Sequence, residues 1–357
     1  VSDQTVSVTT TDDDVAGFTI AETGGSTSVA ESGTTDTFTV VLDAEPASDV
    51  VLAVTSSDTG EATVNGSSVD NNSLTFTSAN WDTPQSFTVT GADDDLVDGT
   101  VTSTLTVTVV DALSEDSFDS INDQAVSVTT TDNDVAGFTI AETGGSTAVA
   151  ESGSTDTFTV VLDAQPTSDV VIAITSNDTG ESSVPSALTF TPANWDTAQT
   201  VTVTGVDDDI IDGTQTSSLT IAVDDFNSDN DFDSVADQTV SVTTSDNDVA
   251  GFTITESSGS TGVVESGTTD TFTIVLDAQP SSDVVIAITS DDPGEATVSG
   301  SLTFTSANWD TAQTVTVTGV DDDIIDGTQT SSLTVAVVDP LSDDDFDSVS
   351  DQNRSEE

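Results

Sequence analysis

Val15-Ala-Gly-Phe18-Thr-Ile20 decides the architecture of this chain, because the same six residues return at positions 135–140 and 249–254. The three copies begin 120 and 114 residues apart. Self-similarity at a fixed period of this length indicates tandem domains of one kind. The shorter second spacing reflects an insertion in the first repeat, at residues 64–72, and insertions of this kind belong in surface loops.

Apolar residues between these markers alternate with a period of two, as in Phe38, Val40 and Leu42. Such segments are short, rich in β-branched residues, and bounded by Gly, Asp, Ser and Asn, which is typical of strands joined by turns. Seven or so strands in about 115 residues describe an antiparallel sandwich with Greek-key connections. We therefore predict an all-β protein of three tandem Greek-key antiparallel β-sandwiches, Ig-like and in a linear array.

The charge balance is extreme, with 66 Asp and Glu against one Lys or Arg, no His, and a formal net charge of −65. A compact chain this acidic repels itself. The carboxylates nevertheless lie in short clusters between Val, Ile, Phe and Thr stretches that can bury surface, so we predict a folded protein that requires cations. A surface adapted to high salt would scatter its acidic residues along the strands instead of collecting them in turns.

Several partners and locations are excluded by composition. The absence of Cys leaves no disulfide framework and no thiolate metal site. Basic patches are absent, which excludes nucleic acid and anionic membranes as partners. The sequence has no apolar run long enough to span a bilayer, so we expect no direct membrane insertion. We interpret the start at Val1 as a mature, processed chain or an excised segment, and expect it outside the cell or at the cell surface.

The two ends depart from the repeat pattern. Residues 1–14 match residues 121–134 and 235–248, which close the first and second repeats. At the other end, Arg354 and Glu356 stand where the repeats alternate valines. Because a charge in a core position carries a heavy desolvation cost, we predict that the third repeat lacks its own last strand.

These observations divide the chain into five segments. The predicted division is an N-terminal donor strand and acidic linker at 1–14, repeat one at 15–134, repeat two at 135–248, repeat three without its last strand at 249–352, and a divergent C-terminal tail at 353–357.

A sandwich that lacks a strand exposes an apolar groove and an unpaired edge, which is a template for a strand from another molecule. The N-terminal segment of a second copy has the missing sequence, with Gln4, Val6, Val8 and Thr10 as the polymerisation strand. Such an interface is heterologous and need not close, so it builds a linear filament. We expect head-to-tail polymerisation of copies of this chain; a long repeat array cut out of phase is the alternative.

Carboxylates gather at two kinds of place in each repeat: a dense turn after a strand, and the junction that follows the last strand. Three adjacent carboxylates do not all stay ionised cheaply unless a cation joins them. Calcium takes six to eight oxygen ligands in flexible geometry, which suits clustered Asp. The predicted turn ligands are Asp93, Asp94, Asp95, Asp98, Asp207, Asp208, Asp209, Asp212, Asp321, Asp322, Asp323 and Asp326; the junction ligands are Asp12, Asp14, Asp132, Asp134, Asp246 and Asp248.

Residues 135–248 resemble a Calx-beta domain as it recurs in bacterial surface adhesins, through the acidic turn after Val-Thr-Val-Thr and the closing Val-Ser-Val-Thr-Thr-x-Asp-Asn-Asp. The resemblance covers essentially the whole chain. It implies calcium at one end of each sandwich, held by an early-strand Glu, the acidic turn and the acidic exit of the last strand. The implied early-strand residues are Glu22, Glu142 and Glu256. Repeat three would take Asp12 and Asp14 from a neighbouring copy.

Other acidic positions are less informative. Gln215 stands where the family often has a second Glu, which implies fewer or weaker ions. We interpret two pairs, Glu31 with Asp36 and Asp58 with Glu61, as solvated loops. The Asp-rich turns at 115–119, 229–233 and 343–347 are either further ion sites or ordinary loops.

Together these patterns favour a structural role. We expect a subunit of a calcium-stabilised extracellular filament, with other surface proteins or glycans as further partners. The alternative is a covalent extender segment of a large repeat adhesin, made rigid by calcium at the junctions. An enzyme is not expected, because every carboxylate cluster recurs in the repeats and no His, Cys or distinct nucleophile accompanies any of them.

Overall fold

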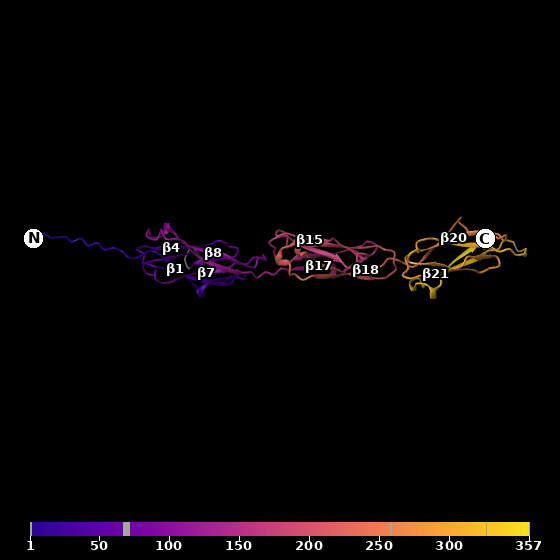
Figure 1. The fold of residues 1–357 in the computed structure, drawn as a ribbon, viewed down its shortest axis with the longest axis horizontal. Coiled ribbons are helices and arrows are strands. Elements are labelled where there is room, and N and C mark those ends of the chain that lie inside the picture. The colour runs from indigo at the N-terminus through magenta and orange to yellow at the C-terminus, as the bar shows by residue number, and fades with distance from the viewer. Residues whose placement is uncertain (1, 67–71, 258, 326, 357) are drawn as a thin grey trace.

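Three β-sandwiches lie end to end in the computed structural model, which describes residues 2–66, 72–257, 259–325 and 327–356 (Figure 1). Each sandwich has two facing sheets, and consecutive strands repeatedly switch sheets, as in a Greek key. The all-β prediction and the tandem array are confirmed. No helix in this part of the chain is long and apolar enough to cross a membrane.

The first sandwich has a four-stranded and a five-stranded sheet. In spatial order the first sheet is β1 (Phe18–Glu22), β3 (Thr35–Leu42), β7 (Gln85–Gly91) and β5 (Ala62–Gly66), and the second is β2 (Thr27–Ala30), β9 (Gln124–Thr131), β8 (Thr100–Val109), β4 (Val50–Ser56) and β6 (Ser73–Phe76).

The second sandwich repeats this order. Its sheets are β10 (Phe138–Glu142), β12 (Thr155–Leu162), β16 (Gln199–Gly205) and β14 (Ser182–Ser183), facing β11 (Thr147–Ala150), β18 (Gln238–Ser245), β17 (Gln215–Val223), β13 (Val170–Ser176) and β15 (Ala187–Phe190).

The third sandwich has two four-stranded sheets. They are β19 (Phe252–Glu256), β20 (Thr269–Leu276), β24 (Gln313–Gly319) and β22 (Ala296–Val298), facing β23 (Leu302–Phe304), β21 (Val284–Ser290), β25 (Ser331–Val337) and β26 (Gln352–Glu356).

Strand pairing is antiparallel, as predicted, with two exceptions among the described residues. β2 pairs with β9, and β11 with β18, in parallel. The parallel pairs matter for the site, because both strands of each pair end at the same edge of the sheet. Short 3-10 turns join some of the strands, such as Thr23–Gly25 between β1 and β2.

The inward-facing residues of each sandwich form one apolar core, in which phenylalanines are the largest side chains. In the first sandwich Phe38 and Phe87 are fully buried, with ring centroids 5.3 Å apart. One Trp in each repeat, Trp81, Trp195 or Trp309, packs half-buried against the core. Full burial of a Phe contributes on the order of 2 kcal/mol, so the alternation seen in the sequence supplies most of the stabilising surface.

Successive sandwiches contact each other through the acidic turn of one and a loop of the next. The Gln165 N–H donates to the Asp95 carbonyl at 2.6 Å, and the Val97 N–H donates to the Gln165 carbonyl at 2.9 Å. Val97 is 9% exposed and belongs to the core cluster of the second sandwich. The same joint recurs between repeats two and three, where the Gln279 N–H donates to the Asp209 carbonyl at 2.6 Å.

Residues 2–14 form no strand and extend away from the first sandwich (Figure 1). Val6 and Val8 are 86% and 83% exposed. Their counterparts in the first repeat, Val126 and Val128, are buried in β9. The N-terminal segment therefore has the sequence of a core strand without the surroundings of one.

The prediction that repeat three lacks its last strand is wrong for the first part of that strand. Gln352–Glu356 form β26, which pairs with β25 so that Leu333 faces Arg354. In repeat two, Leu219 faces Val240 in the same register. Residues 353–356 of the predicted tail are thus aligned as expected but are paired within their own sandwich, and Glu357 lies outside the described residues.

Arg354 avoids the desolvation cost on which that prediction was based. Its guanidinium reaches the edge strand β19, where it contacts the Glu256 carboxylate at 3.2 Å and donates to the Ile254 carbonyl at 3.3 Å. The side chain stays 33% exposed. A long cationic side chain can bury its stem and keep its charge near solvent, which a strictly alternating pattern does not capture.

The second part of the last strand has no counterpart among the described residues of repeat three. In repeat one, Val128–Thr131 pair with β2. The equivalent of β2 in repeat three, residues 261–264, has no such partner and is not a strand. This part of the third sandwich remains an open edge.

Candidate metal centre

Three strand ends bring acidic residues to one pole of the first sandwich. Glu31 follows β2 and Asp132 follows β9, and because these strands are parallel, the two residues leave the sheet together. The acidic turn follows β7. It is attached to this pole by the Ala92 N–H, which donates to the Glu61 carbonyl at 2.8 Å.

A glycine permits the close approach of these segments. A Cβ on Gly91, at the end of β7, would collide with the Ala30 carbonyl oxygen. Gly205 and Gly319 lie against the equivalent carbonyls in repeats two and three. Glycine at this position therefore lets the strand that leads into the acidic turn lie beside the segment that carries Glu31.

Two overlapping groups of carboxylates converge at this pole. One oxygen from each of Glu31, Asp132 and Asp134 lies within 4.8 Å of the others, and so does one from each of Glu31, Glu61 and Asp98. Glu31 belongs to both groups. The Asp132 carboxylate is oriented by the Gly99 N–H at 2.9 Å and the Asp134 N–H at 2.6 Å.

Several of these oxygens are buried without a hydrogen-bond donor. They are Glu31 Oε1, Glu61 Oε2, Asp98 Oδ1 and Asp134 Oδ2. Glu31 is 1% exposed and Glu61 is 5% exposed. A buried carboxylate without a partner is costly, and the sole cationic side chain of the chain, Arg354, is engaged with Glu256 in repeat three. The donor set therefore fits a bound cation.

Burial is also the main cause of shifted pKa values here. Burial, aided by nearby carboxylates, raises the pKa of Glu31 to about 7, although the Asn133 N–H opposes the shift. Burial and neighbouring carboxylates also raise the pKa of Glu61, Asp98 and Asp134. A cation at the pole would replace the protons that these groups otherwise retain.

Repeat two contains the same arrangement. Oxygens from Glu151, Asp246 and Asp248 lie within 4.8 Å of one another, as do those from Glu151, Glu181 and Asp212. Burial raises the pKa of Glu151 to about 7. The constellation therefore recurs with the domain repeat, with the same buried Glu shared by both groups.

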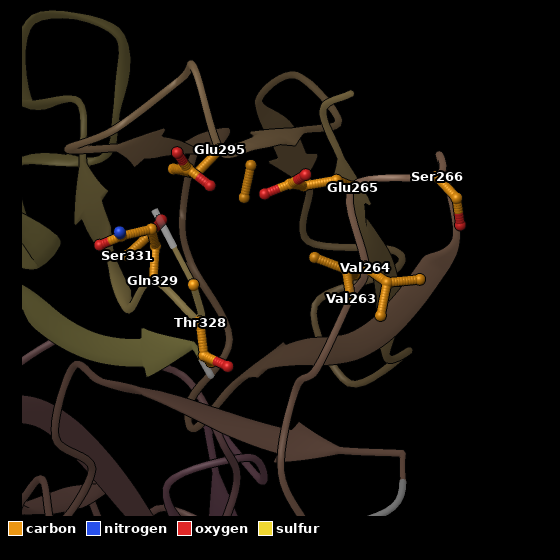
Figure 2. Close-up of a pocket in the computed structure, with 10 residues that line it drawn as sticks. Val263, Val264, Glu265, Ser266, Glu295, Thr328, Gln329 and Ser331 are labelled. Carbon is orange, nitrogen blue, oxygen red and sulfur yellow. The ribbon is translucent and has the colours of Figure 1, made fainter. Parts of the chain in front are cut away.

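Repeat three presents part of this constellation beside the open edge. Its counterparts of Glu31 and Glu61 are Glu265 and Glu295, whose carboxylates point into a groove of about 630 Å3 (Figure 2). Thr328, Gln329 and Ser331 line the side of the groove that faces Val263 and Val264 (Figure 2). In repeat one, the corresponding space is filled by the end of β9 and the acidic residues that follow it.

The structure brings many of the predicted ligands together. Asp98, Asp132, Asp134, Asp212, Asp246 and Asp248 are members of the clusters. The Asp94 carboxylate helps to raise the pKa of Glu31, and Asp208 does the same for Glu151. Other carboxylates of the acidic turns help to raise the pKa of the junction residues Asp134 and Asp248, namely Asp93, Asp95, Asp207 and Asp209. Asp12 and Asp14 are exposed on the N-terminal segment, Asp321, Asp322 and Asp323 lie on the free turn of repeat three, and Asp326 lies outside the described residues.

The early-strand residues implied by the resemblance are not in these clusters. Glu22 and Glu142 instead accept hydrogen bonds from the Thr27 and Thr147 hydroxyls, at 2.9 and 2.8 Å. Glu256 pairs with Arg354. The acidic residue that the early part of each repeat contributes is the one after β2 or β11.

Sequence reasoning missed Glu31, Glu61, Glu151 and Glu181 by treating the first two as solvated. A usable signal was present, because a Glu recurs at both positions in every repeat, as Glu265 and Glu295 show. The interpretation of Asp36 as a loop residue is wrong too, because it is half-buried in β3, where its carboxylate accepts a hydrogen bond from the Ser28 N–H at 3.0 Å.

In the Asp-rich turns of repeats two and three, at the opposite pole of each sandwich, one carboxylate anchors a loop. Asp229 is 5% exposed and accepts from the Thr167 hydroxyl at 2.6 Å and the Ser168 N–H at 2.7 Å. Although burial raises it, these hydrogen bonds hold the pKa of Asp229 below its ordinary value. Asp343 is held in the same way in repeat three. Neither carboxylate needs a cation.

No protein-family profile and no curated protein sequence matches the chain. Solved structures with a similar arrangement include calcium-binding domain CBD12 of CALX1.1, with a TM-score of 0.23 and 15% identity over 57% of this chain and 80% of the other. An I-band fragment of titin has a TM-score of 0.27 and 7% identity, over 97% of this chain and 98% of the fragment. Domains 4–9 of the surface layer protein SbsC have a TM-score of 0.25 and 17% identity, over 95% of this chain and 49% of the other. Similarity at this level assigns neither a ligand nor a role.

The clusters predict how stability depends on pH without metal. A carboxyl whose pKa is raised from 4.5 to about 7 by folding stabilises the folded state below pH 4.5 and loses that contribution as pH rises through 7. We therefore expect the free energy of unfolding of metal-free protein to fall between pH 5 and 8, by on the order of 3 kcal/mol for each such Glu. Denaturant titrations in metal-depleted buffer measure this. Saturating calcium should reverse the trend, and a flat profile in both conditions would contradict it.

Proposed function

We propose that this chain is a structural subunit of a calcium-stabilised extracellular filament, in which copies join head to tail by donor-strand complementation. The observation that carries the calcium requirement is the set of buried carboxylate oxygens without donors at the poles of repeats one and two. Calcium accepts this all-oxygen donor set and its irregular geometry. The Asp and Glu residues would hold the ion, and the ion would supply the positive charge that the sequence lacks.

Calcium at these poles would stiffen the array. Each cluster lies beside the joint to the next sandwich, since the Asp231 carboxylate of repeat two contributes to the raised pKa of Asp98 in repeat one. An ion there neutralises charge on both sides of the joint and ties the acidic turn to the exit of the last strand. The expected product is a rod in which successive sandwiches keep a fixed orientation relative to each other, so that it can extend far outside the cell.

Donor-strand complementation is supported by the exposed N-terminal segment and the open edge of repeat three. An incoming Gln4–Val8 segment would replace Gln352–Glu356 in the same register, so that Val6 takes the place of Arg354. Burial of each exposed valine would contribute roughly 1.5 to 3 kcal/mol. Residues 9–14 would then continue into the groove beside Glu265 and Glu295.

The second candidate is a covalent extender segment of a large repeat adhesin. In that case residues 2–14 complete a preceding repeat of the same chain, and residues beyond 357 fill the groove of repeat three. The same calcium chemistry applies, but no assembly between separate chains follows. Mass spectrometry of the native protein distinguishes the two through the positions of its termini.

Deletion of residues 2–11 tests the filament directly. Electron microscopy of the full chain after calcium addition should show filaments many subunits long, and the deletion variant should show only separate folded rods. The deletion removes no residue of the three described cores, so its melting temperature serves as the folding control. Normal filaments from the deletion variant, or separate rods from the full chain, would overturn the proposal.

A further inference from the structure

The free acidic turn of repeat three exposes two isoleucines. Ile324 is 65% exposed, and Ile325 is fully exposed at its place in the turn. In repeat one the equivalent Val97 is buried in the core cluster of the next sandwich, and in repeat two Ile211 packs against the core of repeat three. The turn of repeat three therefore has the apolar half of a joint, and no sandwich covers it among the described residues.

The first sandwich has the matching half. Its loop at residues 43–46 corresponds to the loops that carry Gln165 and Gln279, which pair through their backbone with the preceding acidic turn. Glu45 occupies the equivalent position and is exposed, whereas Gln165 and Gln279 are half-buried. The two hydrogen bonds of the first joint use only backbone atoms of Gln165, so Glu45 can make both of them. The Gln165 and Gln279 side chains also donate to the Pro192 and Ser306 carbonyls of their own sandwiches, at 2.9 and 3.0 Å, and a Glu carboxylate cannot donate this bond.

The path of the chain makes both contacts compatible. Within the molecule, residues 124–134 complete one sandwich and lead directly into the next at residue 135. Residues 4–14 lead into the first sandwich at residue 15 in the same way. A donor strand seated in repeat three would therefore carry the first sandwich of its own chain to the free acidic turn. The second contact would be nearly intramolecular and would strengthen the first.

We propose that the turn at residues 321–325 is a docking surface for the 43–46 loop of a second copy of this chain, with Ile325 packing against the first sandwich of that copy. The inference rests on the proposed filament and adds a second interface to it. Asp12 and Asp14 of the incoming copy would lie beside Glu265 and Glu295, so the joint would close only around a cation. Glu45 adds another negative charge to this contact and makes its calcium requirement stricter than that of the internal joints.

The test is Ile325→Asp in the full chain, followed by sedimentation velocity and electron microscopy in calcium. Loss of one buried Ile contact should weaken association at least tenfold, giving short filaments at concentrations where the unaltered chain forms long ones. Leu341→Asp is the matched control, because Leu341 is 64% exposed in repeat three but lies outside the turn. Both sites are exposed, so the melting temperatures should match that of the unaltered chain.

The outcomes separate the two proposals. Long filaments from Ile325→Asp, together with none from the 2–11 deletion, would leave the donor strand in place and overturn the docking surface. Equal weakening by Leu341→Asp would also overturn it, since added charge alone would explain the effect. An unaltered chain that stays monomeric in calcium would overturn the filament itself. Glu45→Gln adds a check from the other side, since it should lower the calcium concentration needed for association.

Discussion

Removal of calcium is expected to lower the melting temperature by about 10 °C or more and to loosen the joints. An ion present at a hundred times its dissociation constant stabilises the folded state by about 2.7 kcal/mol. For a domain of roughly 115 residues, each kcal/mol shifts the melting temperature by about 4 °C. Without the ion, carboxylates such as Glu31 and Asp134 stay buried beside one another, which adds a further unfavourable contribution.

Two measurements check this result. Differential scanning calorimetry with calcium and with chelator gives the change in melting temperature, and small-angle X-ray scattering gives the length distribution of the rod. After chelation the distribution of rod lengths should extend to shorter values. The reason is that the sandwiches keep their folds while the angle between neighbouring sandwiches is no longer fixed. Magnesium at the same concentration is the control, since it demands a stricter octahedral geometry and retains its waters. Identical scattering curves with and without calcium would refute the rigid rod.

Glu151→Gln should have the second large effect and should act in opposite directions with and without calcium. Glu151 belongs to both carboxylate groups of repeat two, and it is 1% exposed. The amide removes a buried negative charge, so the metal-free variant should be more stable than the unaltered chain. In calcium the variant should lose most of the stabilisation of that repeat, because one shared ligand serves both groups.

Glu142→Gln is the matched control in the same repeat. The Calx-beta resemblance implies Glu142 as a ligand, whereas the structure places its carboxylate on the Thr147 hydroxyl at 2.8 Å. Gln can accept the same hydrogen bond, so calcium binding should be unchanged. Isothermal titration calorimetry of both variants, with ions counted per chain, decides between the two residues. Fewer ions in Glu142→Gln than in Glu151→Gln would contradict the assignment.

The fold was predictable because its determinants are local and repeated. Alternation at residues such as Phe38, Val40 and Leu42 predicts strands with one buried face, and three copies of the same pattern predict three sandwiches. The parallel pairing of β2 with β9 was not predictable in this way. It joins segments about 100 residues apart, and no local signal distinguishes a parallel from an antiparallel edge pair.

The candidate site was predictable only in part, for the same reason. Asp132 and Asp134 stand out because they cluster in the sequence. Glu31 and Glu61 are isolated in the sequence, and only the parallel strand ends and the close approach at Gly91 bring them to the cluster. The wrong prediction that repeat three lacks β26 has a different cause. A period-two pattern shows which face of the sheet Arg354 is on, but it does not show that the long side chain can extend to the edge strand β19.

The parallel contact between β2 and β9 also determines how each sandwich resists pulling. Tension enters a sandwich through β1, which continues into β2, and leaves through β9. Because β2 and β9 are parallel and are pulled from opposite ends, the hydrogen bonds between them are loaded in shear. The second sandwich has the same mechanical clamp in β11 and β18. In the third, residues 261–264 make no such pairing in the described structure, so force would peel that sandwich open first unless a borrowed strand restores the clamp.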